Sequence, residues 1–76
     1  MNNQRRKEIE AVLNELADLR SRIETIQSEE QDAYDNMPEG LRASERGEKA
    51  EAACSNLDNA ICAFDEIESA LNDAAE

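Results

Sequence analysis

The amino-acid sequence predicts an all-α fold: an antiparallel helical hairpin of the coiled-coil type, formed by one domain of residues 1–76. Three observations predict it. Two apolar series follow heptad spacing, both glycines and the only proline lie between positions 38 and 47, and the two series keep a constant register when paired antiparallel. The heptad pattern is decisive because composition alone favours disorder: Leu, Ile, Val and Phe supply 13 of 76 residues and the net charge is −11.

The first helix is expected over residues 4–36. Its apolar residues alternate in spacings of three and four, which is the pattern of a coiled-coil seam. Asn2 or Asn3 is expected to cap its N-terminus, although the three basic residues at positions 5–7 then lie beside the positive end of the helix dipole. Only Glu30 interrupts the apolar content. The expected seam residues are Ile9, Val12, Leu16, Leu19, Ile23, Ile26, Glu30, Ala33 and Met37.

The turn is expected over residues 37–44. Pro38 disfavours helix at the residue before it, and Gly40 is free to adopt a positive φ. Ser44, followed by an acid, resembles the N-cap of a second helix. Gly47 is the weak point of this prediction, because it would lie inside the first turn of that helix.

The second helix is expected over residues 45–74. Folded back on the first helix, its seam gives six antiparallel layers, in which Val12 for example lies opposite Leu71. Ile67 is expected to be buried in place of its neighbour Glu68, which interrupts the heptad. The expected seam residues are Ala50, Cys54, Leu57, Ile61, Phe64, Glu68, Leu71 and Ala75.

A second apolar stripe beside this seam consists almost wholly of alanine. Two helices alone leave most seam residues open on one side, so a lone hairpin is marginal in stability. We therefore expect a homo-oligomer, either a dimeric four-helix bundle or a larger helical assembly. The alternative is that the stripe docks on a different protein. The expected oligomer interface, called the alanine stripe below, is Ala53, Ala60, Ala63, Ile67, Ala70 and Ala74.

The residue types present disfavour catalysis and metal binding. Histidine is absent, which removes the commonest general base and a common metal ligand. Cys54 and Cys62 are eight apart on one helix and cannot bridge within it; Cys54 is expected in the seam and Cys62 nearer the surface, where it remains able to pair between chains. The acids between positions 32 and 39 do not fit a calcium loop. We expect no enzyme activity, no metal and no cofactor.

Long apolar runs are also absent, so neither a membrane span nor a signal peptide is expected. The sequence thus favours a cytoplasmic protein, and the resemblance described below makes the cell a bacterial host.

The second helix is strongly acidic, with seven acids and no base from position 50 to position 76. Such a surface repels nucleic acid and acidic membranes and attracts basic partners. In its sharpest form this hypothesis makes the surface a mimic of a phosphate backbone; the alternative is a solvated face that keeps an alanine-rich bundle soluble. The expected partner-binding residues are Glu51, Asp58, Asp65, Glu66 and Asp73.

The turn is the local exception to this negative charge. Arg42 in the turn and Arg46 and Lys49 just after it lie near the expected N-terminus of the second helix, an arrangement that binds phosphate groups. Tyr34, before the turn, offers a ring on which a nucleotide base can stack. A simpler explanation is charge balance at the helix start, including an i, i+4 pair of Glu45 with Lys49. The candidate anion or nucleotide site comprises Tyr34, Arg42, Ser44, Arg46 and Lys49.

Three segments, residues 32–41, 44–52 and 56–61, resemble small acidic helical-hairpin proteins of bacteriophages and mobile elements. The likeness covers positions 24–72, and its most specific parts are the turn and the Ser-Glu-Arg-Gly stretch that begins at Ser44. The resemblance implies a phage or prophage context, in which small acidic non-enzymatic proteins often bind host machinery. Together with the acidic surface, it leads us to expect a non-enzymatic protein that binds, and is able to inhibit, a basic host protein of defence or nucleic-acid handling. The alternatives are an oligomeric sponge for a nucleotide or other phosphate ligand, and a purely structural assembly unit.

Overall fold

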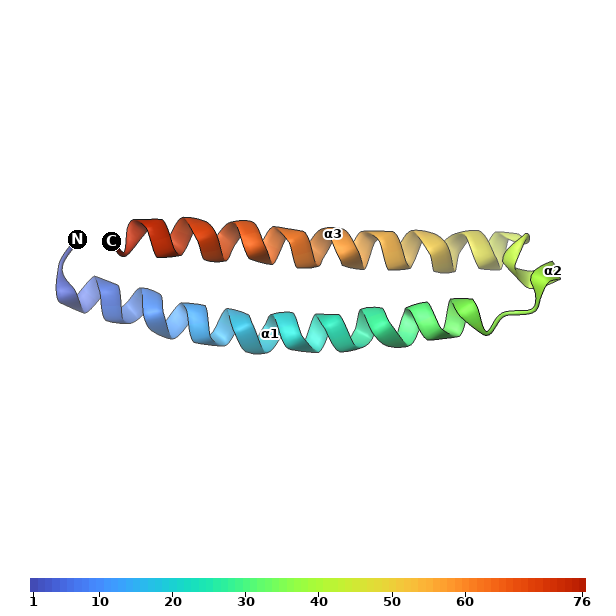
Figure 1. Ribbon diagram of the computed structural model, residues 1–76, viewed down its shortest axis with the longest axis horizontal. Coiled ribbons are helices and arrows are strands. Elements are labelled where there is room, and N and C mark those ends of the chain that lie inside the picture. Colours follow the sequence, from blue (N-terminus) through green and yellow to red (C-terminus); the bar gives the residue numbers. More distant parts are fainter.

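The computed structural model describes residues 1–76 and contains three helices and no strand: α1 (Asn3–Asp35), α2 (Glu39–Arg42) and α3 (Glu45–Ala74). The all-α prediction is confirmed. The molecule is elongated, with extents of 58 × 15 × 12 Å. The two long helices α1 and α3 pack side by side and run in opposite directions, so that both termini lie at one end and the short α2 lies at the other (Figure 1).

The boundaries of the long helices agree closely with the sequence prediction. Asn2 caps α1, since its side-chain Oδ1 accepts a hydrogen bond of 2.8 Å from the backbone N–H of Arg5. The turn differs from the prediction because it contains α2, for which Pro38 is the N-cap residue. A proline suits a helix start because the first N–H groups of a helix have no intrahelical partner.

Ser44 occupies the predicted N-cap position of α3 with an extended backbone, φ −89° and ψ 173°. Its hydroxyl does not cap the helix, however, but donates to the backbone carbonyl of Leu41 in α2. The side chain therefore ties α2 to the start of α3.

The seam of α3 lies where its heptad predicted. Every predicted position is buried or half-buried, and Gly47 extends the series by one step towards the turn. Glu68 keeps its place in the seam, whereas Ile67 is 46% exposed. The expectation that Ile67 would be buried in place of Glu68 is therefore wrong. The physical reason is an ion pair from α1 that reaches Glu68, described below.

The seam of α1 is rotated relative to the prediction. Ile9, Leu16, Ile23, Glu30 and Met37 face α3 as expected. The predicted seam residues that lie between these do not face α3. In each case the next residue along the chain faces α3 instead. The observed alternate residues are Leu13, Arg20, Gln27 and Tyr34, in place of Val12, Leu19, Ile26 and Ala33.

This rotation leaves large apolar side chains in contact with water. Val12 and Leu19 are each 44% exposed, and Ile26 is 53% exposed. A pair of helices covers only one narrow stripe on each partner, so α1 cannot turn both series towards α3 at once. The predicted layers that used Val12, Leu19 and Ile26 as buried positions, such as Val12 opposite Leu71, are thus corrected.

Full burial is confined to the turn end of the helix pair, at Gly47, Ala50 and Cys54. Neither glycine has a positive φ. Gly47 is instead required by close approach, because a Cβ there would overlap the backbone of Arg42 in α2. The residue that seemed to weaken the helix start is therefore the one that allows α2 and α3 to pack together.

Candidate interaction surfaces

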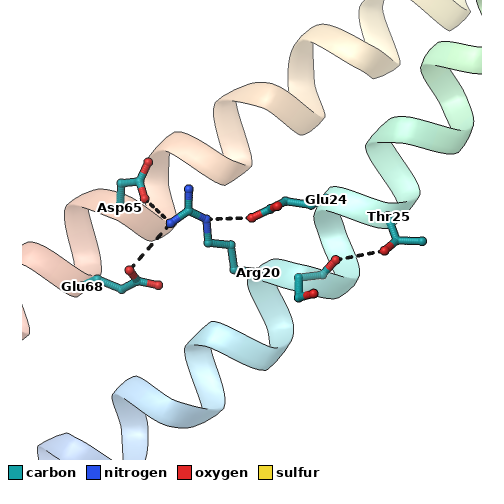
Figure 2. A network of polar contacts seen from close by, with 6 residues as sticks. Arg20, Glu24, Thr25, Asp65 and Glu68 are labelled. Atoms are coloured by element: carbon teal, nitrogen blue, oxygen red, sulfur yellow. Dashed lines mark hydrogen bonds and ion pairs between the residues drawn. The ribbon is translucent and has the colours of Figure 1, made fainter.

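The most connected polar group in the molecule is the Arg20 cluster, which comprises Arg20 and Glu24 of α1 with Asp65 and Glu68 of α3 (Figure 2). Nη1 of the Arg20 guanidinium contacts Asp65 Oδ1 and lies 3.8 Å from Glu68 Oε2, while Nε lies 3.0 Å from Glu24 Oε1. Nε forms an ion pair with Glu24 but has no hydrogen-bond partner. Arg20 thus links the two long helices.

This cluster explains why Arg20, rather than Leu19, faces α3. A polar pair within an apolar seam favours the register and orientation in which both partners meet, because any slip leaves a half-buried charge unpaired. The side chain of Arg20 is only 31% exposed, and that of Glu68 only 26%. A heptad reading that admits only apolar residues cannot find such a pair. The available signal was a base on α1 and an acid on α3 at matching antiparallel positions.

The candidate acidic surface is distributed along α3 rather than gathered at one point. Glu51, Asp58 and Asp65 recur at seven-residue intervals and share one side of the helix, while Glu66 and Asp73 lie next to that side. All five are exposed. Only Asp65 makes an ion pair within the chain, so most of this negative charge is directed to solvent.

Most residues of the candidate anion site at the turn make contacts within the chain. Arg42 donates to the backbone carbonyl of Asp35 at the end of α1, and its guanidinium lies 5.7 Å from the ring centroid of Tyr34. Lys49 Nζ lies 3.4 Å from the carboxylate of Glu45, the pair that the simpler explanation anticipated.

Ser44 is also engaged, through the hydrogen bond to Leu41 described above. Of the five candidate residues, Arg46 alone makes neither an ion pair nor a side-chain contact of these kinds, and no pocket is present at the turn. The arrangement offers a phosphate group one free cation on an open surface.

The two cysteines occupy different environments. Cys54 is buried and Cys62 is exposed, as the heptad predicted. Burial raises the pKa of the Cys54 thiol above its ordinary value of 9.0, and the negative charges of Glu30, Asp58 and Asp35 raise this pKa further. A thiol held in its neutral form is a poor nucleophile, so Cys54 acts as a small apolar residue.

No group of three or more Cys, Asp or Glu side chains is placed to hold a metal ion. No helix combines the length and the apolar content that crossing a membrane requires.

The alanine stripe is divided between two environments. Ala53 and Ala60 border the seam and are half-buried, whereas Ala63, Ile67, Ala70 and Ala74 are exposed. The four exposed residues of the stripe are not covered by any element of this chain.

Comparisons with protein-family models, with curated proteins and with solved structures find no match. The interpretation of function therefore depends on the surface itself. That surface combines exposed carboxylates along α3 with apolar side chains that no helix covers.

Proposed function

We propose that this protein is a non-enzymatic interaction module that binds a basic protein through the acidic surface of α3. One observation carries the proposal: Glu51, Asp58, Glu66 and Asp73 are exposed and form no ion pair within the chain. The eight bases of the chain do little to offset its 19 acids. The charge on α3 is thus available to an external partner.

The spacing of these acids suits an extended partner surface. Residues seven apart on a helix are separated by about 10 Å along its axis, which is close to the Debye length of about 10 Å at 0.1 M salt. The fields of successive carboxylates therefore overlap, which accelerates the encounter with a basic surface and makes it sensitive to salt. The resemblance to phage proteins makes a basic host protein the partner class that we propose, with inhibition as the outcome.

We further propose that the antiparallel pair of α1 and α3 behaves as a coiled-coil-like hairpin that self-associates into a dimeric four-helix bundle or a larger helical oligomer. Large apolar residues that no element covers support this proposal. So does the burial of only 3 of 76 residues, which leaves a lone chain with a small core.

The test of the acidic surface is a charge-neutral variant of α3 that carries Glu51→Gln, Asp58→Asn, Glu66→Gln and Asp73→Asn. A matched control changes four exposed acids of α1 to their amides and so alters the net charge equally; these are Glu8, Glu10, Glu15 and Asp18. Proteins captured from a bacterial lysate by the unchanged chain are purified, and their affinities are measured one at a time by calorimetry.

We expect the α3 variant to lose at least about tenfold in affinity for a basic captured protein, and the α1 control to lose much less. The loss should shrink as salt is raised, because screening weakens the contacts of the unchanged chain as well. Equal losses in both variants would show that net charge alone attracts the partner. Unchanged affinity in the α3 variant would disprove the proposed site.

A further inference from the structure

We infer that one broad face of the α1–α3 pair, apolar along its length and built by both helices, binds a second copy of this chain. The inference deepens the proposed self-association by naming the surface that performs it. The face differs from the alanine stripe because its largest side chains come from α1. The apolar face consists of Val12, Leu19, Ile26 and Ala33 of α1 with Ala53, Ala60, Ile67 and Ala74 of α3.

The two helices contribute to the same face for a geometrical reason. Each of the four α1 residues precedes a seam residue by one position, and so does each of the four α3 residues. Viewed from one end, antiparallel helices turn in opposite senses while their seams point towards each other. The same offset of one residue therefore places both series on the same side of the pair.

This face exposes most of the large apolar surface of the molecule. Val12, Leu19, Ile26 and Ile67 are between 44% and 53% exposed, and they are four of the six large hydrophobic residues that are exposed rather than half-buried. None of these eight residues is charged, and the charged residues Glu8, Glu15, Arg22 and Glu29, which also precede seam positions of α1, border the face. Glu24 and Asp65 of the Arg20 cluster, together with Glu51 and Asp58, lie on the opposite side, because these residues follow seam positions rather than precede them.

The exposed area of the chain matches what a dimer would cover. A compact protein of 8.5 kDa exposes about 4,650 Å², whereas this chain exposes 5604 Å². The excess of about 950 Å² is close to the roughly 800 Å² that each partner buries in an interface of standard size. The projection of the helix pair along its shortest axis, the direction of view in Figure 1, measures 58 × 15 Å and has a similar area of about 870 Å².

The shape of the face favours a second copy over a foreign protein. Its α1 half carries large side chains at positions 12, 19 and 26, and its α3 half carries alanines at positions 53, 60 and 74 with Ile67 among them. A two-fold axis parallel to the helices stacks α1 of one copy on α3 of the other, so that each contact is made twice, as in an isologous interface. In the register of the pair, Val12 and Ile26 then lie nearest to Ala74 and Ala60 of the second copy, and Leu19 lies nearest to its Ile67. The acids that follow seam positions lie on the opposite side and stay apart in this dimer, so they oppose association little.

The test is the concentration dependence of mass, measured by sedimentation equilibrium. The unchanged chain should have twice its mass of 8.5 kDa. A double variant, Leu19→Gln with Ile26→Gln, should weaken the dimer by roughly a hundredfold or more, since a symmetric interface loses four apolar side chains. The matched control is Ala11→Gln with Ala17→Gln, which adds the same polar groups at exposed positions outside the face. This control should leave the dimer intact.

A labelling measurement keeps the test valid if the glutamine variant fails to fold. A Leu19→Cys chain that also carries Cys62→Ser should react with a thiol reagent more slowly at high protein concentration than at low concentration, because the second copy covers position 19. A rate that does not change with concentration in an assembled chain would overturn this face while leaving self-association standing. A chain that remains at 8.5 kDa at every concentration would overturn self-association as well, and would assign the face to a foreign partner. Neither outcome bears on the acidic surface, which the calorimetry tests separately.

Discussion

The two ends of the α1–α3 pair are stabilised in different ways. At the turn end, Gly47, Ala50 and Cys54 are small and fully buried. At the opposite end, large residues such as Ile9 and Leu71 are only half-buried, and polar contacts from α1 reach across to α3. The difference shows that in a two-helix structure small side chains give complete burial, because they let the backbones approach, whereas large ones leave part of their surface in water.

Arg6 supplies the polar contact at the terminal end. Its Nε donates across the pair to the backbone carbonyl of Ala75 at 3.0 Å. Its Nη1 donates within α1 to Asn3 Oδ1 at 3.2 Å. Arg6, one of the basic residues that were unfavourable at the start of α1, thus lies beside the negative end of the α3 dipole, where a cation is stabilising. We expect this end to open first in local unfolding and the turn end to open last.

The largest effect is expected at Gly47. A Gly47→Ala variant should lose about 1–3 kcal/mol of unfolding free energy, because the new Cβ forces the Arg42 backbone away from α3. Urea denaturation followed by circular dichroism, at one protein concentration throughout, measures the loss.

Gly40→Ala is the matched control. No atom lies within 4 Å of a Cβ at this position, which is helical, so the change should stabilise the chain by about 0.4–1 kcal/mol. If the two alanine variants behaved alike, close packing at the turn end would not be the reason for the glycine.

The next effect concerns the burial of Cys54. Its thiol should react with an alkylating reagent at least about tenfold more slowly than that of Cys62, because it is both covered and held neutral. Mass spectrometry of the labelled peptides gives the two rates. Similar rates would show that the turn end opens as readily as the exposed surface.

The same thiol predicts a dependence of stability on pH. Because the folded-state pKa of Cys54 is raised, the folded chain holds this proton more tightly than the unfolded chain does. This contribution is fully present below the ordinary thiol pKa of 9.0 and is lost as the pH rises through the raised value. Between pH 7 and pH 10 the unfolding free energy of the unchanged chain should therefore fall more than that of a Cys54→Ala chain. If the two unfolding free energies fell in parallel with pH, Cys54 would not be the source of this dependence.

The smallest effect is expected from the Arg20 cluster. An Arg20→Gln variant should lose about 0.5–1 kcal/mol at low salt, since the ion pairs are partly exposed, and the loss should shrink at 1 M salt. Arg22→Gln is the matched control, because Arg22 is exposed and makes no ion pair. If Arg20→Gln lowered the unfolding free energy no more than Arg22→Gln does, the Arg20 cluster would not be what fixes the register of α1 against α3.

The limits of the sequence prediction follow from this comparison of the two ends. The seam of α3 was predictable because its apolar residues form a single heptad series from Ala50 to Ala75. On α1, the predicted seam and the observed seam have every second residue in common and differ by one position at the residues between. Which residue of such a neighbouring pair faces α3, for example Leu19 or Arg20, depends on the acids that α3 presents. That information lies in the partner helix, so the periodicity of α1 alone pointed to the wrong residues.

The candidate sites show the same limit. The exposure of the α3 acids followed directly from their heptad positions. The engagement of Arg42 with Asp35 and Tyr34 did not, because it depends on the path of the chain through α2, a helix of four residues without a periodic signal. The apolar face was likewise hidden, since it became visible only when the rotation of α1 was known.

The position of the two termini at one end has a mechanical consequence. A pulling force applied between Asn3 and Ala75 separates α1 from α3 one layer at a time, as a zipper opens, and first breaks the hydrogen bond from Arg6 to the Ala75 carbonyl. The load then passes in turn to each layer and reaches the close-packed residues beside α2 last. A force applied between the turn and one terminus would instead act along the helix axes and load many layers at once, so the molecule should resist it far more strongly.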